Sequence, residues 1–209
     1  MLLSNGLAAS EDRKPTNLKQ SNSSKNAAAT TQTRPASQRI DPLQFDPDLV
    51  ARLVFEKTND ERRKAGLKPF AWMDGLAAAA AGHSVEMAGH NYFSHTGKGV
   101  FKRSNVSSRA DNAGVQARAL AENIAMLPTF RSQQTRTFID AHGKRSQRVE
   151  QEGNSYEELA VWAMDQWMNS PGHRQNILNP ALTQLGVGVA LGDNKGVPYV
   201  YLTQDFAGE

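Results

Sequence analysis

The end of the chain constrains its fold most strongly, because it has the pattern of two neighbouring strands. Residues 185–191 (LGVGVAL) and 197–206 (VPYVYLTQDF) are rich in β-branched and aromatic residues, and a short Gly-Asp-Asn-Lys-Gly segment lies between them. This composition favours strands, and the turn-forming residues between them favour an antiparallel hairpin. Because the upstream apolar patterns are helical, the sequence predicts an α+β fold built in layers.

Three upstream segments have helical patterns with recognisable ends. Asp46 followed by Pro47 predicts the start of a first helix, which Gly66 ends, and residues 74–88 form a second. Ser155 and Glu158 form a capping box for a third, which stops before Pro171. A short helix is expected near residues 101–107, and the short apolar run at 119–125 fits either a strand or a helical turn.

Two polar regions flank or interrupt this pattern. Residues 1–40 have almost no large apolar side chains, which predicts a flexible leader; the alternative is a helical extension docked on the body. The folded domain is then residues 41–209. Within it, residues 128–153 are expected to form an exposed, polar, basic insertion without chemistry of its own.

Charge and composition exclude several classes of function. The chain has a net charge of +3, but residues 1–40 carry six basic residues against two acidic, so the remaining residues carry eighteen against nineteen. A nearly neutral body gives no reason to expect a nucleic-acid partner. The absence of cysteine excludes disulfides and thiolate metal sites, and no apolar run approaches the length that spans a bilayer.

Four polar residues are candidates for a functional or structural role. His173 follows a Ser-Pro-Gly break, which is expected to fix its backbone in a turn and leave its imidazole free to point into a groove. His95 lies in the irregular segment HNYFSHTGKG, where Tyr92 and Phe93 can pack inward. Glu122 interrupts an apolar run, so it either faces a polar cleft or pairs with a cation or protonated imidazole. His83 falls on the apolar stripe of its helix and is expected to be a core histidine.

Five motifs occur in a characteristic order, and with them the chain resembles a bacterial member of the CAP superfamily, of the SCP-like extracellular type. The motifs are HNYFSH, AENIA, a tryptophan before SPGHRQNIL, LGVGVA and YVYLTQDF. The resemblance covers residues 46–206. It implies a three-layer α-β-α sandwich with a central, mostly antiparallel sheet, and an extracellular or periplasmic location.

The resemblance also implies a cleft with two histidines and two glutamates. His95, Glu122 and His173 match three of these positions, whereas Ser170 stands where the second glutamate would be. His95 and His173 could bind zinc weakly and replaceably, because structural sites use four protein ligands. The alternative is a hydrogen-bonded network without metal. If the site is a shared cleft, Glu122 is expected to raise the proton affinity of both histidines.

Three functions remain open at this point. The first is a secreted, monomeric, non-enzymatic binding module for a small molecule, lipid or peptide. The second is a metal-assisted hydrolase with Glu122 as general base, which the missing second carboxylate weakens. The third is an interaction protein that contacts the cell envelope through its basic leader and insertion.

Overall fold

A computed structural model describes residues 34–98 and 104–208 and contains one central sheet. Its four strands, in spatial order, are β1 (Ala71–Trp72), β5 (Gln184–Asn194), β6 (Val197–Gly208) and β2 (Ala119–Pro128). Only the pairing of β1 with β5 is parallel. The sheet is therefore mostly antiparallel, and residues 119–125 belong to a strand and not to a helical turn.

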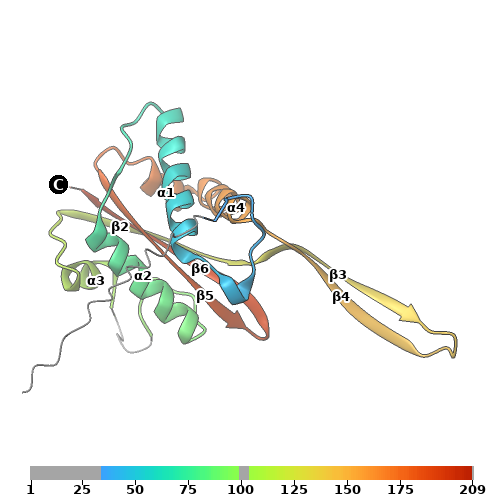
Figure 1. Ribbon diagram of the computed structural model, residues 1–209. Coiled ribbons are helices and arrows are strands. Elements are labelled where there is room, and N and C mark those ends of the chain that lie inside the picture. The colour runs from blue at the N-terminus through green and yellow to red at the C-terminus, as the bar shows by residue number, and fades with distance from the viewer. Residues whose placement is uncertain (1–33, 99–103, 209) are drawn as a thin grey trace, which may run out of the picture. The chain divides into compact units, whose positions relative to one another are not determined.

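Helices cover both faces of this sheet, as Figure 1 shows. On one face lie α1 (Pro47–Lys64), α4 (Tyr156–Met168) and α5 (Pro171–Ile177), and a short 3₁₀ turn, η1 (Pro42–Gln44), precedes α1. On the other face lie α2 (Asp74–Gly89) and α3 (Val106–Asn112). The predicted three-layer α-β-α sandwich is confirmed.

Alternation along β6 explains why both faces need a helical cover. Val200, Leu202 and Phe206 pack into the core formed with α1 and α4. Tyr201 and Ala207 point the other way and pack in the clusters that contain Met87 and Leu76 of α2. Because successive side chains of a strand point to opposite faces, a strand with apolar residues at both parities must be buried on both sides.

Two glycines of β5 allow α2 to approach the sheet closely. A Cβ atom added at Gly186 would lie 2.0 Å from the backbone nitrogen of Ala77, and one at Gly188 would lie 2.0 Å from that of Ala81. Neither distance is sterically possible for a real side chain. The alternating glycines of LGVGVAL therefore set the separation between α2 and β5.

The predicted helix starts are confirmed at atomic detail. The Asp46 carboxylate accepts a hydrogen bond of 2.9 Å from the backbone N–H of Leu49 at the start of α1. Ser155 and Glu158 form the predicted reciprocal capping box of α4. Both caps accept hydrogen bonds from backbone N–H groups that have no partner within the first turn of a helix.

Three local predictions are corrected. The connection between β5 and β6 is shorter than expected, because β5 continues to Asn194; Lys195 and Gly196 form the turn with φ of 58° and 81°. His173 lies in the first helical turn of the short helix α5 and not in an irregular connection, because a new helix begins at Pro171. Phe93 is 48% exposed, whereas Tyr92 packs inward as predicted.

The helix expected near residues 101–107 also lies elsewhere. Helix α3 begins at Val106, where Asn105 caps it with Ser108. The part of the prediction that concerns residues 101–103 lies outside the described residues.

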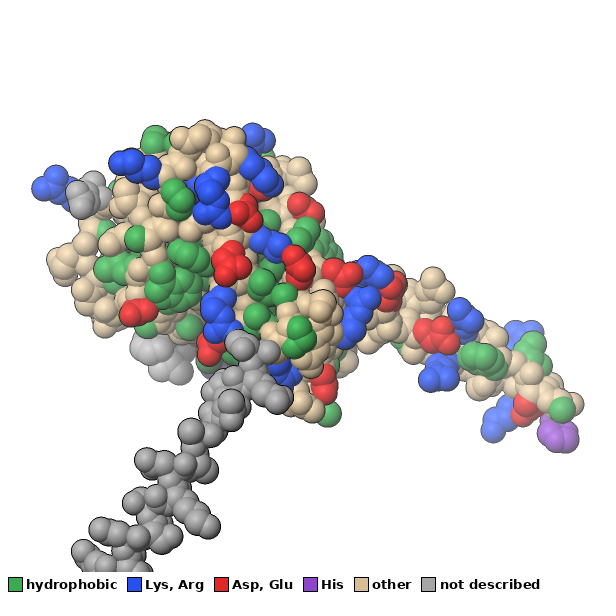
Figure 2. Space-filling view, turned by 45° about the horizontal axis from the view of Figure 1, so that its top comes forward, with side chains coloured by type: hydrophobic (Ala, Val, Ile, Leu, Met, Phe, Trp, Pro, Cys, Tyr) green, Lys and Arg blue, Asp and Glu red, His purple; other side chains and the backbone are tan. Residues whose placement is uncertain are grey.

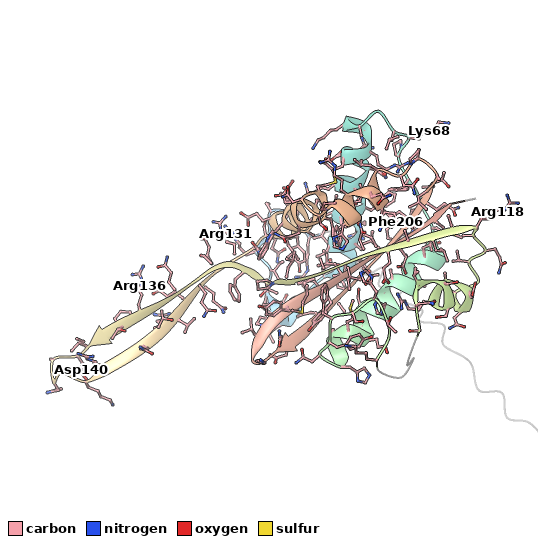
Figure 3. The ribbon with its side chains drawn as sticks, turned by 180° about the vertical axis from the view of Figure 1, so that it is seen from behind. Lys68, Arg118, Arg131, Arg136, Asp140 and Phe206 are labelled. Atoms are coloured by element: carbon pink, nitrogen blue, oxygen red, sulfur yellow. The ribbon has the colours of Figure 1, made fainter. Side chains whose placement is uncertain are left out.

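The polar segment 128–153, which was expected to be an exposed insertion, forms a two-stranded ribbon. Its strands, β3 (Phe130–Ile139) and β4 (Arg145–Gly153), pair with each other and form a sheet of their own. Nearly every side chain of the ribbon is exposed. In Figure 3, the labelled residues Arg131, Arg136 and Asp140 mark its course from its base to its turn.

The folded unit begins before residue 41. Ile40 is buried, its backbone N–H donates to the carbonyl of Asn154 at 2.9 Å, and Gln38 accepts from the N–H of Tyr156 at 3.2 Å. Residues 34–40, which the sequence assigned to the leader, are thus part of the unit that spans residues 34–209. The rest of the predicted leader, residues 1–33, lies outside the described residues.

Candidate functional site

Glu122 lies at the centre of the candidate site, on β2, with its side chain only 4% exposed. Its Oε1 atom accepts a hydrogen bond of 2.7 Å from Nδ1 of His95, and its Oε2 atom forms an ion pair with the guanidinium of Arg109. A buried carboxylate is costly unless it is paired and hydrogen-bonded. Of the alternatives that the sequence left open for Glu122, the structure therefore shows the pairing with a cation, Arg109, and with an imidazole, His95.

Arg109, on α3, holds more than the carboxylate. The same guanidinium donates to the backbone carbonyl of His95 at 3.3 Å and to that of Ser104 at 3.2 Å. It thereby ties the segment after α2 to the carboxylate that the His95 ring contacts. Sequence reasoning missed Arg109, because nothing in the polar stretch SNVSSRADN distinguishes a buried arginine from a solvated one.

His83 is a core histidine, as predicted. Its Nε2 atom donates to the backbone carbonyl of Ser94 at 2.9 Å, which fixes the residue directly before His95. Burial, and then the positive charge of Arg109, lower the pKa of His83, so the ring is neutral at neutral pH. Its contribution to the site is to position the His95 segment.

Asp205 is a second buried carboxyl group that sequence reasoning missed. It lies directly opposite Glu122 in the pairing of β2 with β6 and is fully buried. Burial, together with the negative charge of Glu122, raises the pKa of Asp205 well above its usual value, although Arg109 opposes the shift. The argument applied to Glu122, a carboxyl group inside an apolar strand, could have identified Asp205 in YVYLTQDF as well.

His173 reaches the site from the other helical layer, at the start of α5. Asn123, the neighbour of Glu122, donates from Nδ2 to the backbone carbonyl of His173 at 3.2 Å. Asn176 donates to Oδ1 of Asn123 at 2.9 Å and to the backbone carbonyl of Glu122 at 3.3 Å. The asparagines of AENIA and GHRQNIL therefore join α5 to β2 through their side-chain amides.

The pKa of His173 is lowered, by burial first and then by the charge of His95. The expectation that Glu122 raises the proton affinity of both histidines is therefore wrong for His173. Burial disfavours the charged imidazolium, and the second imidazole is close enough to disfavour it further. A neutral imidazole is the form that binds a metal ion.

A cavity of about 280 Å³ lies beside His173. Ser170 lines it together with Gln166, Trp167 and the half-exposed ring of Phe93, and residues 124–127 of β2 complete the wall. Trp167 is fixed by a 3.0 Å hydrogen bond from Nε1 to the carbonyl of Ile124. A larger groove of about 800 Å³ lies elsewhere, beside α4 and the base of the ribbon, around Arg39, Arg131 and Trp162.

The donor set fits a weak metal site better than a strong one. Because Nδ1 of His95 donates to Glu122, the Nε2 atom of a neutral His95 carries the free lone pair, an arrangement common in metal-ligating histidines. Within residues 34–98 and 104–208, however, no group of three or more histidine and carboxylate side chains is placed to hold a metal ion. Two imidazoles alone would leave about half of the coordination positions of a tetrahedral zinc ion open.

These features define a class: an α-β-α sandwich in which a loop after α2 places His95 against a buried glutamate–arginine pair, and the start of α5 is bonded to the neighbouring strand position through the backbone of His173. The family model described as "CAP: Cysteine-rich secretory protein family" matches residues 55–206. The chain belongs to this family, although it contains no cysteine.

Relatives in sequence and structure agree with this assignment. The chain is 31% identical over 153 residues to the "Uncharacterized membrane protein YlbC" and 33% identical over 135 residues to the "Uncharacterized protein YkwD", both of Bacillus subtilis. These matches cover 73% and 65% of this chain but only 33% and 40% of those proteins. Among the described residues, no helix is long and apolar enough to cross a membrane.

Solved structures show the same fold. An extracellular protein containing a SCP domain from Bacillus anthracis superimposes with a TM-score of 0.53 at 26% identity, over 78% of this chain and 41% of that one. An outer surface protein from Borrelia burgdorferi superimposes with a TM-score of 0.51 at 13% identity, over 83% of this chain and 99% of that one. The second likeness concerns the fold alone.

Proposed function

We propose that this protein is an exported, non-enzymatic binding module whose cleft at His95 and His173 accepts a small molecule, a lipid or a peptide segment. The observation that carries the proposal is the clamp on Glu122, which is held by Arg109 and bonded to Nδ1 of His95. This clamp orients a half-exposed imidazole at the mouth of the site. Small-molecule sites use a few precisely placed polar groups to fix the orientation of the ligand, and the clamp gives the His95 ring such a fixed position.

The same two histidines are the ligands that would hold a divalent ion such as zinc. When bound, the ion would offer a Lewis-acidic position to a donor atom of the ligand. His95 contributes Nε2, His173 contributes a ring kept neutral by burial, and Glu122 orients His95. With two protein ligands the ion is replaceable and does not stabilise the fold.

The cavity beside His173 supplies a place for an apolar part of the ligand. Phe93, Trp167 and the apolar side chains of β2 line it, and Ser170 and Gln166 add polar groups at its wall. A mostly apolar pocket with a few convergent polar groups is typical of small-molecule sites. Its volume, about 280 Å³, fits a small group or one segment of a longer chain.

Binding is favoured over hydrolysis because both carboxylate oxygens of Glu122 already have partners. One of its oxygens accepts from His95 and the other pairs with Arg109. A general base needs an oxygen that can reach the proton of a water molecule. Glu122 therefore suits a positioning role, and Ser170 replaces the second carboxylate with a hydroxyl. The Bacillus anthracis relative is an extracellular protein, which supports an extracellular location for this chain.

Calorimetric zinc titration tests the proposal. Wild type should bind one ion weakly, and His95→Ala and His173→Ala should each lower the affinity by about tenfold or more. His142→Ala, in the exposed turn of the ribbon, is the matched control and should bind as wild type does. Affinity should also fall as the pH drops below about 6.5, because protonation competes with the ion. Unchanged binding in both site variants would overturn the shared-cleft assignment.

A further inference from the structure

The outer part of the β3–β4 ribbon combines exposed apolar side chains with unpaired cations. Phe138, Ile139 and Val149 are 46%, 63% and 52% exposed, although they are large hydrophobic residues. A two-stranded ribbon has no core in which to bury them, and nothing in the described part of the chain covers them. Phe138 and Ile139 lie beside the turn on opposite faces of the ribbon, and Val149 lies farther back on the face of Ile139. Large apolar side chains left exposed at the end of a projecting ribbon are typical of an interaction surface.

The charges of the ribbon differ between its base and its outer part. At the base, Arg131 is paired with Glu152 and with Glu158 of α4. In the outer part, residues 135–149 carry four basic side chains and one acidic. Within the described residues, Lys144, Arg145 and Arg148 form no ion pair, whereas Arg136 contacts Glu150 at 2.9 Å.

The register of the ribbon places like charges opposite each other. Arg136 pairs directly across from Arg148, so the two guanidinium groups share one face. Like charges at directly opposite positions destabilise a strand pair. A two-stranded ribbon without a core is only marginally stable, so this repulsion matters for it. The contact of Arg136 with Glu150 offsets part of this repulsion, and an anionic surface that contacts both guanidinium groups would offset the rest. Figure 2 shows the basic and hydrophobic side chains gathered over this end of the ribbon.

We propose that the outer part of the β3–β4 ribbon docks onto an anionic lipid bilayer. Phe138 and Ile139, next to the turn at residues 140–144, enter the boundary between headgroups and acyl chains, and Lys144, Arg145 and Arg148 contact the anionic headgroups. A soluble anionic polymer would satisfy the cations only. The exposed apolar side chains beside the turn are what favour a bilayer. The proposal is independent of the histidine cleft.

Vesicle flotation with the full chain tests this docking. Wild type should bind vesicles of equal parts phosphatidylcholine and phosphatidylglycerol, and should not bind phosphatidylcholine alone. Removing the cations in Lys144→Gln/Arg145→Gln/Arg148→Gln should weaken binding on the order of a hundredfold, about fivefold for each cation. Removing the apolar contacts in Phe138→Ser/Ile139→Ser should weaken it at least about tenfold.

Matched controls separate local docking from general attraction. Arg52→Gln/Lys68→Gln/Arg118→Gln removes the same charge from exposed positions elsewhere, and Leu43→Ser/Val85→Ser removes exposed apolar residues elsewhere. Both should bind vesicles as wild type does. If the Phe138→Ser/Ile139→Ser variant binds vesicles as tightly as wild type, attraction to an anionic polymer explains the cations and the bilayer proposal is wrong. Equal loss in a control and its matched ribbon variant would also overturn it.

Discussion

Arg109 is the residue on which the geometry of the site depends most. It is buried, neutralises Glu122 and holds the backbone of His95. Arg109→Gln would leave a buried carboxylate without its counter-charge, a change that costs roughly 3–5 kcal/mol in other proteins. We expect a lower melting temperature and weaker zinc binding. Arg118→Gln, an exposed arginine on the same connection, should change neither; a stable Arg109→Gln variant would contradict this role.

Asp205 gives the protein a distinctive dependence on pH. Its pKa is raised in the folded state, so the unfolded chain ionises first as the pH rises above about 4. Folding stability from this group is therefore highest in acid and is lost as the pH rises towards the folded-state pKa.

Asp205→Asn tests whether Asp205 makes the protein less stable as the pH rises, because the amide has nearly the same shape as the carboxyl group and no charge. The melting temperature of the variant should exceed that of wild type at neutral pH, and the difference should shrink towards a pH of about 4. Thermal unfolding followed by circular dichroism across this range measures it. A difference that does not change with pH would show that Asp205 is not the group responsible.

At the scale of single elements, the close contact between α2 and β5 is the least tolerant part of the fold. Gly188→Ala would place a Cβ atom 2.0 Å from the backbone of Ala81, and neither backbone can move without shifting a whole element. We expect a loss of stability of about 1–3 kcal/mol or more, as for other overpacked cores.

Gly82→Ala, within α2, is the matched control. No atom lies within 4 Å of the added Cβ, and alanine favours a helix over glycine by about 1 kcal/mol. Denaturant unfolding should therefore show this variant to be as stable as wild type or more so. If both glycine variants were equally stable, the contact between α2 and β5 would not be limiting.

The elements also show which features a sequence can reveal. Helix starts at Asp46 and Ser155, and the strands that end the chain, follow from local patterns of caps, turns and alternation. Arg109 and the Asn123–Asn176 contact join segments far apart in the chain, and no local pattern encodes such a meeting. The ribbon was predicted as an exposed polar region but not as strands, because its side chains lack an apolar face.

At the scale of the whole molecule, the position of the first essential residue can be tested by truncation. Deleting residues 1–33 should leave the melting temperature unchanged, since that segment has few large apolar residues. Deleting residues 1–40 should lower stability by about 2 kcal/mol, because Ile40 is buried and the segment bonds to Asn154 and Tyr156. If the shorter deletion destabilises the protein as much as the longer one, the boundary near residue 34 is wrong.

The glycines of β5 have a consequence for motion as well as for packing. With no side chains between them, α2 and β5 cannot separate slightly; they either stay in contact or part completely. Amide protons in the middle of both elements should therefore exchange with deuterated solvent only when the entire domain unfolds, and at matching free energies. Those of β3 and β4, which lack such a partner, should exchange through local opening. Because the segment that carries His95 follows α2 directly, we expect its first residues to exchange as slowly as α2 does.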